Sequence, residues 1–80
     1  MRESEIRNII EALLFAASEP LTQSQINSVF EPEIYNLDEI VILLNKRYTL
    51  NKNSFVINKV AGGYQIVSRE EYNYYINKLL

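Results

Sequence analysis

The sequence predicts an α+β domain of the winged-helix class, with three helices, a two-stranded β-hairpin wing and a C-terminal helix. Three segments begin with a helix-capping pattern, in which Ser, Thr or Asn is followed three residues later by Gln or Glu. The stretch before them, Glu5 to Glu19, carries apolar residues at helical spacing. Two runs rich in β-branched and aromatic residues flank Ala61-Gly62-Gly63. Helices followed by a hairpin in this order are typical of a helix-turn-helix with a wing.

The first helix is expected from about Ser4 to Ser18, because Pro20 disfavours helix in the residue before it. The run Ala12 to Ala17 contains no polar residue. We therefore expect this helix to be covered on more than one side and to be the centre of the core. Its apolar stripe comprises Ile6, Ile9, Ile10, Leu13, Leu14 and Ala17.

The second helix is expected over about Gln23 to Phe30. Thr22 is the N-cap, Gln25 closes the capping box, and Leu21 and Ile26 form the hydrophobic staple. The residues expected to face inward are Ile26, Val29 and Phe30.

The third helix repeats this pattern. Asn36 is the cap, Glu39 stands at the third helical position, and Tyr35 is stapled to Ile40. The helix is expected to run to Tyr48 or Leu50 and, with the second helix, to form the helix-turn-helix. Its expected buried residues are Leu37, Ile40, Val41, Leu44 and Tyr48.

The wing is expected as a hairpin of Phe55 to Val60 and Tyr64 to Val67, in which Gly62 and Gly63 supply the positive φ values of a tight turn. A fourth helix should follow over about Arg69 to Leu80, capped by Ser68 with Glu71 at its third position, and Val67 packed on Tyr72. One side of it presents Tyr72, Tyr75, Ile76 and Leu79. The core is expected to bring together Leu13, Leu14, Ile40, Leu44 and Ile66.

Composition narrows the class of protein. Eighty residues, of which 48% are hydrophobic and 22% charged, suit one globular domain spanning 1–80. The absence of cysteine and histidine excludes disulfides, thiol nucleophiles, histidine bases and nearly all zinc sites. The longest apolar run is too short for a membrane span or a secretory signal. We expect a soluble intracellular domain with no metal, cofactor or small-molecule ligand.

No catalytic constellation is present. Asp38-Glu39 and Glu70-Glu71 are paired carboxylates, but both lie in the first turns of capped helices, where acidic residues stabilise the helix. Gly62-Gly63 leads into a strand, whereas a phosphate-binding loop leads into a helix N-terminus. The sequence therefore predicts a non-enzymatic protein.

The charges are unevenly distributed. Residues 1–40 hold eight acids and two bases (net −6), and residues 41–80 hold two acids and six bases (net +4). The third helix begins with two acids and its outer side offers only Ile42, Leu43 and Asn45, whereas base-reading helices need donors near the N-terminus. A DNA-binding transcriptional regulator is therefore the alternative interpretation, and weak or indirect DNA contact is expected. The candidates for weak phosphate contacts are Lys46, Arg47, Lys52 and Lys59.

Some apolar residues point away from the expected core. Phe15 lies about 180° from Ile6 around the first helix, with a core position as the alternative. Ile42 lies about 140° from Leu37 around the third helix, and Tyr74 about 140° from Arg69 around the fourth. Leu43 flanks the same side of the third helix. Apolar residues on neighbouring helices can form an interface. The sequence therefore predicts a homodimer that uses some of Phe15, Ile42, Leu43 and Tyr74.

Three segments together resemble the segregation and condensation protein B (ScpB) family: Ile10 to Leu21 (IEALLFAASEPL), Val60 to Ile66 (VAGGYQI) and Glu71-Tyr72. The resemblance implies a subunit of the bacterial SMC–kleisin condensin complex that dimerises and binds the kleisin ScpA, and through it SMC, in chromosome condensation and segregation. It also implies a cytoplasmic, nucleoid-associated protein. Family members resemble tandem winged-helix proteins about twice this long, so the chain would correspond to the N-terminal domain. The family often has acidic residues where this chain has Ile42 and Leu43.

Overall fold

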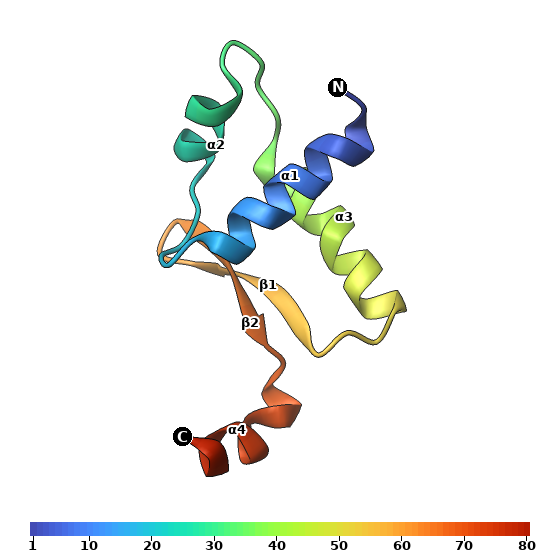
Figure 1. Cartoon of the computed structure of the whole chain (residues 1–80), viewed down its shortest axis with the longest axis vertical. Helices are drawn as coiled ribbons and strands as arrows, with labels where there is room; N and C mark the ends of the chain where they lie inside the picture. The colour runs from blue at the N-terminus through green and yellow to red at the C-terminus, as the bar shows by residue number, and fades with distance from the viewer.

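The computed structural model describes residues 1–80 and has the winged-helix architecture of the α+β class, so the predicted fold class is confirmed (Figure 1). Three helices precede an antiparallel hairpin, and a short helix follows it. In chain order the elements are α1 (Glu3–Ala16), α2 (Gln23–Phe30), α3 (Leu37–Leu50), β1 (Phe55–Val60), β2 (Gly63–Ser68), a 3-10 turn (Glu70–Tyr72) and α4 (Asn73–Leu79).

Helix α1 is amphipathic and is not enclosed by the rest of the chain. Ile6, Ile10 and Leu14 are buried, whereas Ala12 is exposed and Phe15 is 82% exposed. The expectation of cover on more than one side is therefore wrong. The later elements of residues 1–80 pack against one face of α1 and leave the other face exposed.

Helix α1 ends at Ala16, two residues before the expected end. The next residue, Ala17, is already extended, with φ −69° and ψ 132°. The chain then reaches the hairpin, where Leu21 and Tyr64 exchange two backbone hydrogen bonds of 2.8 Å. This bridge requires an extended connection between α1 and Leu21. Helix α1 therefore ends earlier than the effect of Pro20 alone would predict.

The predicted caps of α2 and α3 are present. The Gln25 N–H donates to Thr22 Oγ1 at 3.2 Å, and the Thr22 N–H donates back to Gln25 Oε1 at 2.9 Å. The Glu39 N–H donates to Asn36 Oδ1 at 3.1 Å. Val29 does not face inward as expected; it is 56% exposed, because only the face of α2 that carries Ile26 and Phe30 meets the core.

The turn between α2 and α3 is held by one side chain of α2. Gln23 Oε1 accepts from the Leu37 N–H at 2.8 Å, and Gln23 Nε2 donates to the Tyr35 carbonyl at 2.8 Å. Phe30 and Tyr35 meet edge to face, with ring centroids 5.0 Å apart. The helix-turn-helix is thus joined by polar and aromatic contacts together.

The core lies between the three helices and the hairpin. Of the five residues expected to be buried together, Leu14 and Leu44 are fully buried, and Leu13, Ile40 and Ile66 are partly buried against the same cluster. The eleven buried hydrophobic residues are Ile6, Ile10, Leu14, Leu21, Ile26, Phe30, Leu37, Val41, Leu44, Tyr48 and Ile57.

The two glycines of the wing have different roles. Ala61 (φ 47°) and Gly62 (φ 78°) form the turn, and two left-handed residues are what a type I′ hairpin turn requires. Gly63 belongs to β2, pairs with Val60, and does not have a positive φ. Its expected role in the turn is therefore wrong. Glycine is needed at this position because there is no room for a side chain: a Cβ would lie 2.8 Å from the Leu21 carbonyl oxygen.

The chain after the hairpin forms a projecting C-terminal arm, residues 69–80 (Figure 1). Ser68 does not cap a helix as expected, because it is the last strand residue and pairs with Phe55. The Arg69 N–H continues this edge by donating to the Ser54 carbonyl at 2.9 Å. No residue of the arm is buried, and Tyr72, which was expected to pack on Val67, is 39% exposed.

Candidate functional site

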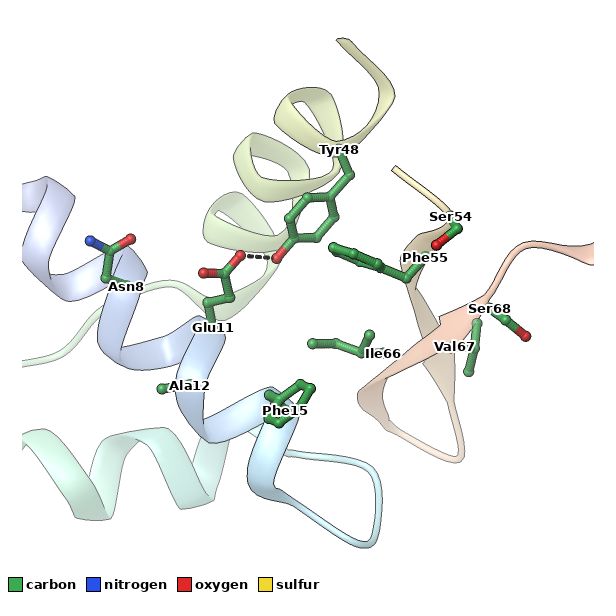
Figure 2. A pocket seen from close by; sticks show the side chains of 10 residues that line it. All are labelled: Asn8, Glu11, Ala12, Phe15, Tyr48, Ser54, Phe55, Ile66, Val67 and Ser68. Carbon is green, nitrogen blue, oxygen red and sulfur yellow. Dashed lines mark hydrogen bonds between the residues drawn. The ribbon is translucent and has the colours of Figure 1, made fainter. Parts of the chain in front are cut away.

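A hollow of about 600 Å³ lies between α1, the C-terminal end of α3 and the hairpin (Figure 2). We call it the α1–hairpin groove. Its polar lining residues, among them Asn8 and Glu11 from α1 and Ser54 and Ser68 beside the hairpin, lie around an apolar interior. The apolar lining consists of Ala12, Phe15, Tyr48, Phe55, Ile66 and Val67.

Phe15 is the most exposed large side chain of the groove. It stands in the last turn of α1, and its ring lies beside Ile66 of β2 across the hollow (Figure 2). The alternative of a core position for Phe15 is excluded by its 82% exposure. An exposed aromatic ring beside a strand residue gives the groove an unfilled apolar contact surface.

The end of the groove next to α3 is closed by a polar contact. The Tyr48 hydroxyl donates to the Glu11 carboxylate, and Arg47 pairs with the same carboxylate at 2.9 Å. Burial of the ring, together with the hydrogen bond to Glu11, raises the pKa of Tyr48 to about 12. The phenol is therefore a hydrogen-bond donor at neutral pH, and it ties α3 to α1.

The hairpin is positioned by Asn45, which sequence reasoning placed on the outer side of α3. Its amide Nδ2 donates to the Ile57 carbonyl at 3.0 Å, and its Oδ1 accepts from the Ile57 N–H at 2.9 Å. Asn45 is thus half-buried and satisfies both backbone groups of one β1 residue. The wall of the groove formed by β1 and β2 depends on this contact.

The four residues expected at an interface are all exposed, but they do not form one patch. Phe15 alone lines the α1–hairpin groove. Ile42 (58% exposed) lies on the outer side of α3 in a shallow hollow with Leu50. Leu43 borders a different hollow between α1 and α3. Tyr74 (63% exposed) lies on the arm, with the Lys78 ammonium 4.8 Å from its ring centroid.

The candidate phosphate-contacting residues are also dispersed. Lys46 lies on the outer side of α3, in the hollow with Ile42, and Lys52 is in the turn after α3. Lys59 lies on β1 with its ammonium 5.8 Å from the Tyr64 ring centroid. Arg47 is already paired with Glu11, so its charge is largely neutralised.

The N-terminus of α3 is acidic and engaged by the wing. The Tyr64 hydroxyl donates to Asp38 Oδ1 at 2.5 Å, and this hydrogen bond, with a contribution from burial, raises the pKa of Tyr64. Asp38 and Glu39 therefore stand where a base-reading helix would present donors. This geometry disfavours sequence-specific DNA reading by α3.

Sequence reasoning missed most of the groove lining. Phe55 and Val67 were expected as hairpin residues without a surface role, and Ile66 and Tyr48 were expected as core residues. Glu11 was not singled out, although it stands on the same side of α1 as Asn8 and Phe15, at helical spacing. The groove depends on the distance between the hairpin and α1, which no local pattern encodes.

No helix of the structure has the length and apolar character needed to cross a lipid bilayer. The structure holds no group of three or more His, Cys, Asp or Glu side chains placed to bind a metal ion.

Comparison with known proteins identifies the family. A family model described as segregation and condensation complex subunit ScpB matches residues 8–80. Segregation and condensation protein B of Clostridium tetani (strain Massachusetts / E88) is 34% identical over 80 residues, which cover 98% of this chain and 42% of that protein. The chain thus spans less than half the length of this curated relative.

Two solved structures share both fold and sequence with the chain. A conserved hypothetical protein from Chlorobium tepidum has a TM-score of 0.85 and 28% identity, over 96% of this chain and 49% of that one. The crystal structure of a dimer of the ScpB N-terminal domain complexed with ScpA peptide has a TM-score of 0.79 and 26% identity. This match covers 96% of both chains.

Proposed function

The chain belongs to the segregation and condensation complex subunit ScpB family, and on that premise we propose that it is a subunit of a bacterial SMC–kleisin condensin complex. It forms a homodimer and binds the kleisin ScpA, and through ScpA it is linked to SMC. Its role is chromosome condensation and segregation during cell division.

The observation that carries this proposal is the presence of two separate exposed apolar surfaces. A protein that pairs with itself and also holds a second protein needs two such surfaces. One is the α1–hairpin groove with Phe15, and the other is the outer side of α3 with Ile42 and Leu50. The solved dimer of an ScpB N-terminal domain with ScpA peptide, which matches over 96% of this chain, supports both kinds of contact.

Three further parts belong to the same proposal. The chain corresponds to the N-terminal winged-helix domain of a longer protein, in line with the fraction of its relatives that it spans. It acts by binding and has no catalytic activity of its own. It works in the cytoplasm, at the nucleoid.

Affinity co-purification with a recombinant fragment of ScpA, beside light scattering of the chain alone, tests the proposal. We expect the kleisin fragment to be retained and the chain alone to have twice its monomer mass of 9.4 kDa. Ile42→Glu, which places a charge on the outer side of α3, should reduce kleisin retention. Ala16→Glu, at an exposed position on α1 outside the groove, is the matched control for an added charge. Retention of no kleisin by a folded parent chain would refute the proposal.

Direct DNA binding is proposed to be weak and independent of sequence. Arg47 is occupied by Glu11, so Lys46, Lys52 and Lys59 are the residues left for phosphate contacts. Three phosphate contacts give a slope of about −3 for log affinity against log salt concentration. Fluorescence anisotropy with duplex DNA measures it. Tight binding to one sequence at physiological salt would instead favour a transcriptional regulator.

A further inference from the structure

The hairpin leaves part of one strand edge without a hydrogen-bonding partner. In an antiparallel pair of strands, every second residue pair exchanges backbone hydrogen bonds, and the residues between them point their N–H and C=O groups away from the partner strand. The Arg69 N–H donates to the Ser54 carbonyl at 2.9 Å, which fixes this alternation for the hairpin. The backbone groups of Ile66 and Ser68 therefore point outward from β2, at the edge opposite β1.

Two further contacts agree with this alternation. Leu21 exchanges two backbone hydrogen bonds with Tyr64, which precedes Ile66 by two residues on the same edge of β2. On β1, the Asn45 side chain bonds both the N–H and the C=O of Ile57, the residue that lies opposite Ile66. The two outward-facing residues of β2 beyond Tyr64 make no backbone hydrogen bond to any other segment.

The two edges of the hairpin differ in how they are protected. The outer edge of β1 is blocked at its centre by Asn45 and carries the charge of Lys59. Charges and covering segments are the usual means by which proteins protect a strand edge. The strand β2, Gly63–Ser68, has no charged residue, and in the connection after α1 Ser18 and Glu19 form a bend that pairs with no strand. The edge of β2 is therefore open to an added strand.

The open edge borders the α1–hairpin groove. Ile66, Val67 and Ser68 all line the groove, where the Ile66 side chain lies beside Phe15 (Figure 2). In an antiparallel sheet, residues directly opposite each other place their side chains on the same face. Two residues of an added strand, those opposite Ile66 and Ser68, would therefore direct their side chains to the face that carries Ile66, next to Phe15.

The charge beyond the open edge is negative. Glu70 and Glu71 follow Ser68 closely in the chain, and neither forms an ion pair in the structure. An added strand that runs antiparallel to β2 has its N-terminal end at this side. A basic residue at that end would be attracted by the two carboxylates, which gives the edge a preferred direction of occupancy.

We propose that the edge of β2 from Ile66 to Ser68 binds an extended segment of another protein by strand addition. The segment runs antiparallel to β2, with apolar residues opposite Ile66 and Ser68 and a basic residue at its N-terminal end beside Glu70 and Glu71. Its backbone bonds to the outward N–H and C=O groups of β2, and its apolar side chains enter the groove beside Phe15. Backbone pairing supplies affinity in this mode of recognition, and the pockets for alternate side chains supply specificity.

This inference goes beyond the proposed function, because it concerns backbone pairing at a strand edge. The test of kleisin binding places a charge at Ile42 on the outer side of α3, which is separate from this edge. A chain that fails to retain the ScpA fragment can still bind a strand at β2, and a chain that retains it can lack this site.

Amide hydrogen exchange of the chain alone tests whether the edge is open. The N–H groups of Gln65 and Val67 face β1 and should exchange slowly, whereas those of Ile66 and Ser68 should exchange at nearly the rate of an unstructured chain. Slow exchange of Ile66 and Ser68 that is lost on dilution would show that a second copy occupies the edge. Slow exchange at every concentration would show that a segment of the same chain covers it. Either result overturns the proposal.

A synthetic peptide serves as the probe for binding. The blocked hexapeptide Lys-Thr-Val-Thr-Val-Thr, labelled with a fluorophore, carries the basic end and the two alternating apolar residues. Anisotropy gives its Kd, and at a concentration ten times Kd it should slow exchange at Ile66 and Ser68 about tenfold. Exchange at Gln65 and Val67 should change less, since their N–H groups already face β1. Absence of binding up to about 1 mM peptide overturns the proposal.

N-methylated peptides distinguish backbone pairing from side-chain contact alone. Methylation of both valine nitrogens removes the N–H groups that face β2 and should weaken binding at least tenfold. Methylation of the two threonine nitrogens that follow the valines, whose N–H groups face solvent, is the matched control and should leave the affinity nearly unchanged. Equal affinities of the two methylated peptides would show that the backbone is not used, and would overturn strand addition.

Variants of the chain test the same contact from the other side. Ser68→Pro removes an N–H that has no partner in the hairpin, which an edge strand tolerates, and should weaken peptide binding about fivefold or more. Ser68→Ala keeps this N–H and should bind like the parent chain. Phe15→Glu should also weaken binding, because it places a charge beside the apolar side chains of the peptide. Thermal unfolding checks that each variant is folded, and the methylated peptides decide the question on the parent chain if Ser68→Pro is not. Equal affinities of folded Ser68→Pro and Ser68→Ala would contradict the proposal.

Discussion

The body of the molecule, residues 3–68, and the C-terminal arm, residues 69–80, have similar local sequence features but different surroundings. Both contain helical segments with apolar residues at helical spacing. All eleven buried hydrophobic residues lie in the body, and none lies in the arm. Local pattern therefore predicts where a helix forms, whereas the position of the other elements decides whether its apolar face is covered. In this chain the body contains the whole buried core, and the arm contributes no buried residue to it.

The largest expected effect tests whether stability is confined to the body. Leu14→Ala removes a side chain from the centre of the core and should lower the free energy of unfolding by about 2–4 kcal/mol. Leu79→Ala in the exposed arm should change it by less than about 0.5 kcal/mol under dilute, monomeric conditions. Urea unfolding followed by circular dichroism measures both. Equal losses would show that the arm is part of the cooperative core.

A smaller effect separates two neighbouring positions at the tip of the wing. Gly63→Ala places a Cβ 2.8 Å from the Leu21 carbonyl oxygen, which cannot move without breaking its hydrogen bond to Tyr64. We expect a loss of about 1–3 kcal/mol. In Gly62→Ala the added Cβ has no atom within 4 Å, so the only destabilisation comes from the backbone φ of 78°. We expect this variant to lose about 1 kcal/mol of unfolding free energy. Thermal unfolding of both variants ranks them, and a larger loss for Gly62→Ala would contradict the assigned roles.

The smallest effect concerns the contact that closes the groove at the edge of the body. The pKa of Tyr48 is raised from 10.0 to about 12. The stabilisation that the protonated Tyr48 hydroxyl gives to the folded state is therefore fully present below pH 10, and it is lost as the pH rises through about 12. Tyr48→Phe should cost about 1–2 kcal/mol near pH 8, and this difference should shrink at pH 11.

Urea unfolding of the parent and of Tyr48→Phe at both pH values gives the comparison, since the other tyrosines and the lysines are common to the two chains. A stability difference that is constant across this range would mean that neither burial nor the Glu11 contact raises the pKa of Tyr48.

Where the determining interactions are local, the sequence was sufficient. The caps of α2 and α3 join residues three positions apart, and both form as predicted. The hairpin follows from the glycines between two β-rich runs, although its left-handed residues are Ala61 and Gly62 and not the predicted Gly62 and Gly63. The order of the elements indicates the winged helix. The third capping pattern, at Ser68, failed because pairing with Phe55 and the bond from Arg69 to Ser54 extend the strand through it.

Only the tertiary structure decided the properties that depend on distant parts of the chain. Asn45 tethers a strand residue 12 positions away, and Glu11 accepts from Tyr48 at a separation of 37. Gly63 is required by the close approach of Leu21, which is separated from it along the chain by α2 and α3. The exposure of Phe15 and of the whole arm follows from where the hairpin ends. A residue's propensity and spacing are encoded in its neighbours along the chain, but its burial depends on which segments fold against it, and that is set by all of the packed elements together.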